Sequence, residues 1–70
     1  LINNNITNLR PLANLVELQW LALNFNQITN LKPLTGLKKL KVLMLTGNTD
    51  LEDSEVEKIE ELLPDCSIEY

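Results

Sequence analysis

The stretch LQWLALNFNQITNLKPLTGLKK, residues 18–39, decides the fold, because a unit of this form recurs along residues 1–49 at a 22-residue interval. Most of its apolar positions return at that interval, and so does one asparagine, as Asn4, Asn26 and Asn48. A fixed period of this size indicates a solenoid of stacked repeats. Because such an array presents a continuous surface, the sequence favours binding over catalysis.

Each part of the unit predicts a local structure. Residues 21–23 and 43–45 alternate leucine with another residue, which predicts short parallel strands whose leucines face inward. Residues 31–37 carry a leucine at every third position, a spacing typical of short 3₁₀ turns, and Pro33 stands near the start of the turn. We expect these turns to form the outer, convex side.

The repeated asparagines are predicted to form a buried structural ladder made of Asn4, Asn26 and Asn48. Each follows a strand at the point where the chain turns, and an amide offers both donors and an acceptor to unpaired backbone groups. Truncating a member of the ladder would leave buried polar groups without partners, at a cost of about 1–3 kcal/mol.

The pattern L-x-x-L-x-L-x-x-N-x-[I/L] over residues 1–49 resembles the core of the leucine-rich repeat family. The 22-residue length, together with the I-T-N-L-x-P-L segment, is similar to the internalin-type bacterial branch. The resemblance implies an α/β solenoid with a short parallel sheet on the concave face and 3₁₀ turns on the convex face. It also implies a protein-binding role in a secreted or cell-surface bacterial protein.

The repeat pattern stops just after Asn48, where the composition changes. Asp50 and Asp53 stand where earlier units carry core side chains. A helix is predicted from Ser54, with Glu57 completing a capping-box pattern and Pro64 ending it.

A last strand is predicted from the spacing of residues 63–68, which repeats L-x-x-L-x-L with Cys66 and Ile68 in the inward positions. This places Cys66 at the position of Leu43, at an interval of 23 residues. The helix and strand would form a C-terminal cap near residues 53–69, within residues 50–70, and the segment resembles the ending of many bacterial leucine-rich repeat proteins.

The first unit is incomplete, since Leu1 already holds the place of Leu23 and Leu45. We therefore expect residues 1–70 to be one domain truncated at its N-terminus, with upstream repeats of the same chain against the N-terminal edge. Without them, that edge would expose apolar side chains and strand backbone, so the 70-residue chain is expected to be poorly soluble or to self-associate.

Composition excludes several kinds of site. The chain has no histidine, which excludes a histidine base, a catalytic triad and a histidine metal site, and one cysteine allows no internal disulfide. No apolar run is long enough to span a bilayer. We predict no cofactor and no metal: the acidic stretch 48–59 lacks the glycine and the closing carboxylate of a calcium loop, which favours a solvated helix start.

Charge divides the chain into two parts. Residues 1–49 carry five basic side chains against one acidic, a net +4, whereas residues 50–70 carry one against nine, a net −8. The lysines at 32, 38, 39 and 41 form a basic streak, which is better explained as a solvated face than as a nucleic-acid site, because the whole domain is acidic.

The outward strand positions are the candidates for partner contact. The predicted register aligns them in four lines: Trp20, Val42 and Asp65; Ala22, Met44 and Ser67; Ile2, Asn24, Thr46 and Glu69; and Asn3, Phe25, Gly47 and Tyr70. The protein-binding residues would be Trp20, Ala22, Asn24, Val42, Met44 and Thr46. Exposed apolar residues around an aromatic anchor are typical of an interface. The alternative is that Trp20 covers neighbouring leucines or an upstream repeat, and Phe25 is expected to be partly buried.

The sequence thus predicts a protein–protein interaction module that binds a protein partner through its concave face and has no enzymatic activity. Two alternatives stay open. The chain could be a structural spacer that presents another domain, or a targeting segment of a larger enzyme or surface protein. Partner capture by the Trp20→Ala and Met44→Lys variants distinguishes the interaction module from the spacer, because only the module would lose its partner. The sequence upstream of residue 1 tests the targeting-segment hypothesis.

Overall fold

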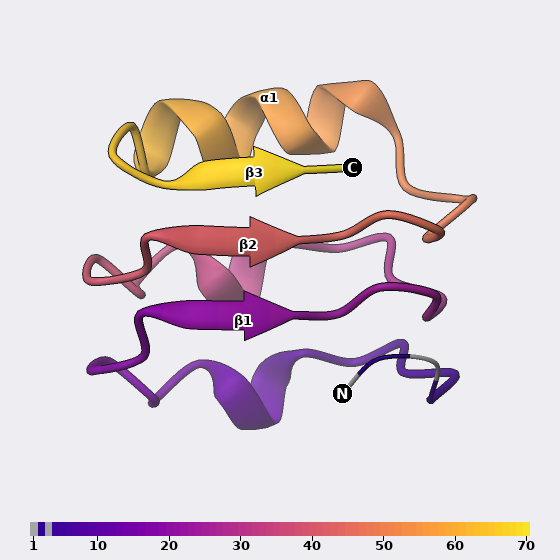
Figure 1. The fold of residues 1–70 in the computed structure, drawn as a ribbon, viewed down its shortest axis with the longest axis horizontal. Helices are drawn as coiled ribbons and strands as arrows, with labels where there is room; N and C mark the ends of the chain where they lie inside the picture. Colours follow the sequence, from indigo (N-terminus) through magenta and orange to yellow (C-terminus); the bar gives the residue numbers. More distant parts are fainter. Residues whose placement is uncertain (1, 3) are drawn as a thin grey trace.

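A computed structural model describes residues 2 and 4–70 and places three parallel strands side by side, with turns and one helix behind and beside them (Figure 1). The elements in chain order are the 3₁₀ turns and strands η1 (Arg10–Leu12), β1 (Trp20–Ala22), η2 (Lys32–Leu34) and β2 (Val42–Met44), then the helix α1 (Asp53–Leu62) and β3 (Ser67–Glu69). The sheet order is β1-β2-β3. The predicted positions of Leu1 and Asn3 lie outside the described residues.

The short parallel strands and the 3₁₀ turns confirm the predicted local structures. The first two strands run from Trp20 to Ala22 and from Val42 to Met44, so each starts and ends one residue earlier than predicted. Leu21 and Leu43 are paired and buried, as the alternation requires. In each 3₁₀ turn the proline, Pro11 or Pro33, is the second residue, where its missing N–H leaves no backbone bond unmade.

Leucine and isoleucine columns from successive units make the core behind the sheet. Leu23, Leu34 and Leu45 are buried there, and Val56 and Ile59 of α1 complete the packing. The first unit is less covered: Leu15 is exposed, although its equivalent Leu37, 22 residues later, is buried. The difference arises because Leu37 has a unit on each side.

The register predicted for the last strand is wrong. Ile68, not Cys66, pairs with Leu43, so the paired residues are 25 positions apart instead of 23. A backbone bond of 2.8 Å from the Ser67 N–H to the Lys41 carbonyl fixes this register. The cause is the connection: α1 and the turn that follows it use more residues than the 3₁₀ return of the earlier units. Cys66 consequently precedes β3 and is not a strand residue, but it is half-buried and packs against the hydrophobic core, which agrees with its predicted inward position.

The predicted capping box is also wrong. The helix α1 begins at Asp53, its N-cap residue is Glu52, and no side chain makes a capping hydrogen bond. Ser54 therefore lies inside the first turn, where its hydroxyl cannot serve as the cap. Asp53 and Glu55 still place negative charge at the positive end of the helix dipole, and α1 ends ahead of Pro64, as predicted.

Candidate protein-binding surface

The sheet face that points away from the core carries two rows of side chains, and we call it the open face. Residues paired across parallel strands share a face, and so do residues two apart along a strand. The register therefore defines the open face as two rows: Trp20, Val42 and Ser67, and then Ala22, Met44 and Glu69. The corrected register brings Ser67 beside Val42, where Asp65 was predicted, and Glu69 beside Met44, where Ser67 was predicted.

One half of the open face is apolar and the other is polar. Trp20 is 58% exposed, and Val42 and Met44 beside it are half-buried. Ser67 and Glu69 of β3 are exposed. The face thus joins an aromatic anchor and two aliphatic contacts to a polar, acidic edge.

Two of the predicted contact residues are not accessible. Ala22 is 7% exposed and Asn24 is 8% exposed, so neither offers appreciable area to a partner, and the expectation that both are exposed is wrong. Outward direction alone does not give exposure, because a small side chain can lie below its larger neighbours. The Asn24 Oδ1 atom is buried and has no hydrogen-bond partner among the described residues. Thr46 is exposed and remains a candidate.

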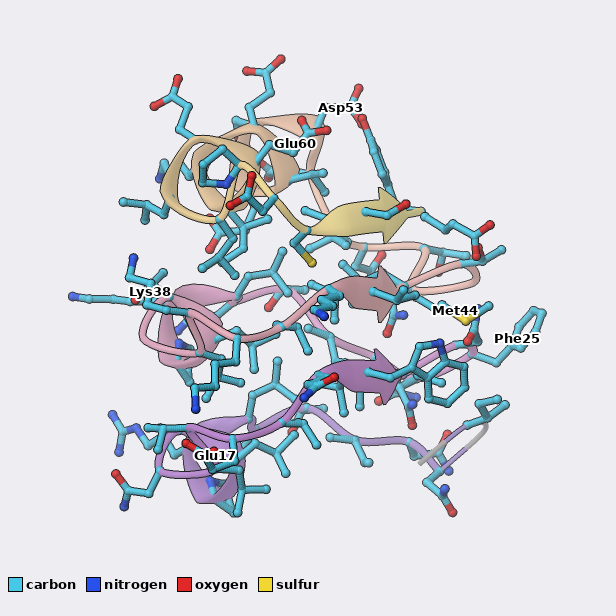
Figure 2. All side chains as sticks on the ribbon, turned by 60° about the vertical axis from the view of Figure 1, so that its left-hand side comes forward. Glu17, Phe25, Lys38, Met44, Asp53 and Glu60 are labelled. Atoms are coloured by element: carbon cyan, nitrogen blue, oxygen red, sulfur yellow. The ribbon has the colours of Figure 1, made fainter. Side chains whose placement is uncertain are left out.

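Phe25 adds an aromatic side chain that was expected to be partly buried, and that expectation is wrong, since it is 57% exposed. Its backbone is left-handed, with φ of 59°, and its ring lies over Gly47, which has φ of 87°. Figure 2 shows Phe25 and Met44 projecting on one side of the molecule, with Lys38 on the opposite side. The left-handed turn thus directs this ring outward beyond the end of β1.

Asparagine side chains hold the turns that follow the strands. Asn26 and Asn48 are buried, and each Oδ1 accepts a backbone N–H of the preceding unit, from Ile6 and Ile28 respectively, at 3.0 Å. The predicted ladder is wrong for Asn4, which is exposed and whose amide donates to the Ile2 carbonyl. Its backbone N–H instead donates to Asn26 Oδ1 at 2.8 Å. The asparagine side chain at this repeat position is buried only where other parts of the fold pack on both sides of its turn.

Glu55 has a role that sequence reasoning missed. Its Oε1 accepts the Leu31 backbone N–H at 3.0 Å and so ties α1 to the η2 turn. Its other carboxylate oxygen lies 3.8 Å from the Lys58 ammonium. The only sequence signal was an acid in the first helical turn, and the repeat pattern could not indicate a partner 24 residues earlier.

Other polar groups serve local contacts. Lys39 pairs with Glu17 at 2.8 Å on the surface, and the Lys38 ammonium donates to the Leu62 carbonyl at 3.2 Å, so part of the basic streak is engaged. Burial raises the pKa of the Cys66 thiol, which favours its neutral, less nucleophilic form.

Within residues 2 and 4–70, no group of three or more histidine, cysteine, aspartate or glutamate side chains could hold a metal ion. In that same range, no helix has the length and apolar character that crossing a membrane requires.

Comparison with known proteins agrees with the repeat geometry. A search of curated proteins found no match. A family model described as "Leucine Rich repeats (2 copies)" matches residues 16–62, which include β1, η2, β2 and α1 and make up more than half of the chain. With its parallel strands, 3₁₀ turns and repeated asparagines, the chain belongs to the leucine-rich repeat family.

Proposed function

We propose that this chain is a protein-recognition module whose open face is the concave, partner-binding face of a leucine-rich repeat array. Leucine-rich repeat domains generally mediate protein–protein interaction and are generally not enzymes. The proposal locates that general role on Trp20, Val42 and Met44, with Thr46 at the margin.

The observation that carries the proposal is the exposure of Trp20 at 58%, directly beside Val42 in the register. Tryptophan is among the residues most enriched at energetic hot spots, and solvent-exposed tryptophan with aliphatic neighbours is typical of a surface that a partner covers. Phe25, more than half exposed, lies beyond the C-terminal end of β1 on the same side of the molecule as Met44 and would extend this surface (Figure 2).

The proposal also covers the end of the array and the type of its repeat. We propose that α1 and β3 close the array as a C-terminal cap. In support, the solvent side of α1 is acidic through Asp53, Glu57, Glu60 and Glu61. The 22-residue repeat supports an internalin-like type and, with it, a secreted or cell-surface bacterial protein.

The test compares partner capture by the immobilised wild-type chain with capture by Trp20→Ala and Met44→Lys. Lys32→Ala and Thr35→Ala, in and next to η2 behind the sheet, are the matched controls. We expect a protein captured from lysate to bind about tenfold more weakly to the first two variants and unchanged to the controls. Equal capture by all of these variants, with the fold intact by circular dichroism, would refute the proposal and favour a structural spacer.

A further inference from the structure

We infer that the partner presents a basic side chain, lysine or arginine, next to an apolar one, and that Glu69 is the residue that selects it. The inference rests on the proposed binding role of the open face and adds the chemistry of the partner to it. It depends on the register of β3, which the sequence pattern alone placed incorrectly.

The register sets Glu69 next to the apolar half of the open face. Glu69 pairs with Met44, and Met44 with Ala22, so the carboxylate is one strand away from the methionine. Neighbouring strands lie about 4.8 Å apart. A partner side chain that packs on Met44 therefore brings the next group along its own surface within reach of the Glu69 carboxylate.

Glu69 forms no ion pair with the other residues that the structure describes. It is exposed, and the ion pairs of the described residues are Lys39 with Glu17 and Lys58 with Glu55. The nearest cation along the neighbouring strand is Lys41, three positions before Met44, and it lies toward the opposite end of β2. A partner that covers this edge with apolar groups alone would desolvate the carboxylate without compensation.

The surrounding charge points the same way. Residues 50–70, which include α1 and β3, carry a net −8, and Lys58 is their one basic side chain. Asp65 and the acidic residues of α1 other than Glu55 are exposed. Together they make the potential on the β3 side of the molecule negative, which attracts cationic surfaces and repels acidic ones.

The experiment is a selection of peptides on the N-terminally biotinylated 70-residue chain, using a phage-displayed random dodecapeptide library. We expect enriched peptides to carry lysine or arginine next to an aromatic or aliphatic residue. For the tightest peptide, followed by fluorescence anisotropy at low salt, Glu69→Gln should weaken binding about threefold and Glu69→Lys about tenfold. A new selection on Glu69→Lys should enrich aspartate and glutamate in place of the basic residues.

Glu60→Lys is the matched control, since it makes the same change of net charge on α1, which Figure 2 shows well away from Met44. It should change the affinity by less than about twofold. Equal losses for Glu60→Lys and Glu69→Lys would overturn the inference, as would an empty selection or the enrichment of acidic or uncharged peptides.

The effect of Trp20→Ala on peptide binding distinguishes this inference from the proposed binding face. If it weakens binding while Glu69→Lys does not, only this inference fails; if it has no effect, the proposed binding face fails.

Discussion

The Asn48 Oδ1 atom accepts a hydrogen bond of 3.0 Å from the backbone N–H of Ile28, a residue of the preceding unit. The same amide donates to the carbonyls of Leu23 at 3.0 Å and Leu45 at 2.7 Å. One buried side chain therefore joins the ends of two strands to the turn between them. This satisfies backbone groups that the short sheet leaves unpaired.

Replacing this amide should be costly, whereas replacing its exposed equivalent should not. Asn48→Ala leaves the buried Ile28 N–H without a partner and removes one of the two hydrogen bonds that the Leu23 and Leu45 carbonyls each accept. We therefore expect a loss of about 1–3 kcal/mol in the free energy of unfolding. Asn4→Ala removes one exposed bond to the Ile2 carbonyl and should cost less than about 0.5 kcal/mol. Urea unfolding followed by circular dichroism measures both. Similar losses for the two variants would show that the buried amide does not hold the units together.

The contact between Phe25 and Gly47 should make Gly47 intolerant of a side chain. A Cβ at Gly47 would collide with the Phe25 ring, and φ of 87° is unfavourable for any residue but glycine. Gly47→Ala should therefore destabilise the fold by about 1–2 kcal/mol. In the Phe25→Ala background the same substitution should cost less, because only the backbone penalty remains. An unchanged cost in that double-mutant cycle would mean that the ring moves aside freely.

The exposed edge of the first unit should drive self-association. Leu15, Val16 and Leu18 line a shallow hollow of about 470 Å³, and Leu15 and Val16 are 47% and 53% exposed. Apolar surface of this kind next to an unpaired strand edge favours contact with another chain. We expect the double variant Leu15→Lys/Val16→Lys to sediment as a smaller species than the wild-type chain at equal concentration. A monomeric wild-type chain at high concentration would contradict this.

Cys66 should make the chain less stable at alkaline pH. Burial raises the pKa of its thiol above the ordinary value of 9.0. The unfolded chain then loses this proton at a lower pH than the folded chain. The resulting stability is present below pH 9 and is lost as the pH rises through the folded pKa.

Two measurements check this role of Cys66. Alkylation by iodoacetamide at pH 8–9 should be slower for the native chain than for the urea-unfolded one. Cys66→Ala should lose less stability between pH 8 and pH 10 than the wild type, and equal losses would count against this role of the thiol.

The features predictable from the sequence are those that repeat. The 22-residue period was enough for β1, β2 and the two 3₁₀ turns, because each position is constrained in the same way in successive units. The register of β3 was not predictable, since the length of the α1 connection has no counterpart upstream.

Burial depends on neighbours that the period does not specify. Asn4 and Asn26 are equivalent by sequence, yet one is exposed and one is buried, because only Asn26 has a described unit on each side. Ala22 is a similar case, since its direction was right but its exposure depends on side-chain size. The contact from Glu55 to Leu31 joins the helix to the repeats and had no periodic signal.

The most direct test of the account is to map where a ligand touches the folded chain. The tightest peptide selected on the wild-type chain should be titrated into the ¹⁵N-labelled protein and followed by NMR. We expect the largest shift changes at the Trp20 indole N–H and at the backbone amides of Val42 and Met44. Changes confined to η2 and α1, with these three groups unaffected, would contradict the assignment of the open face as the binding surface.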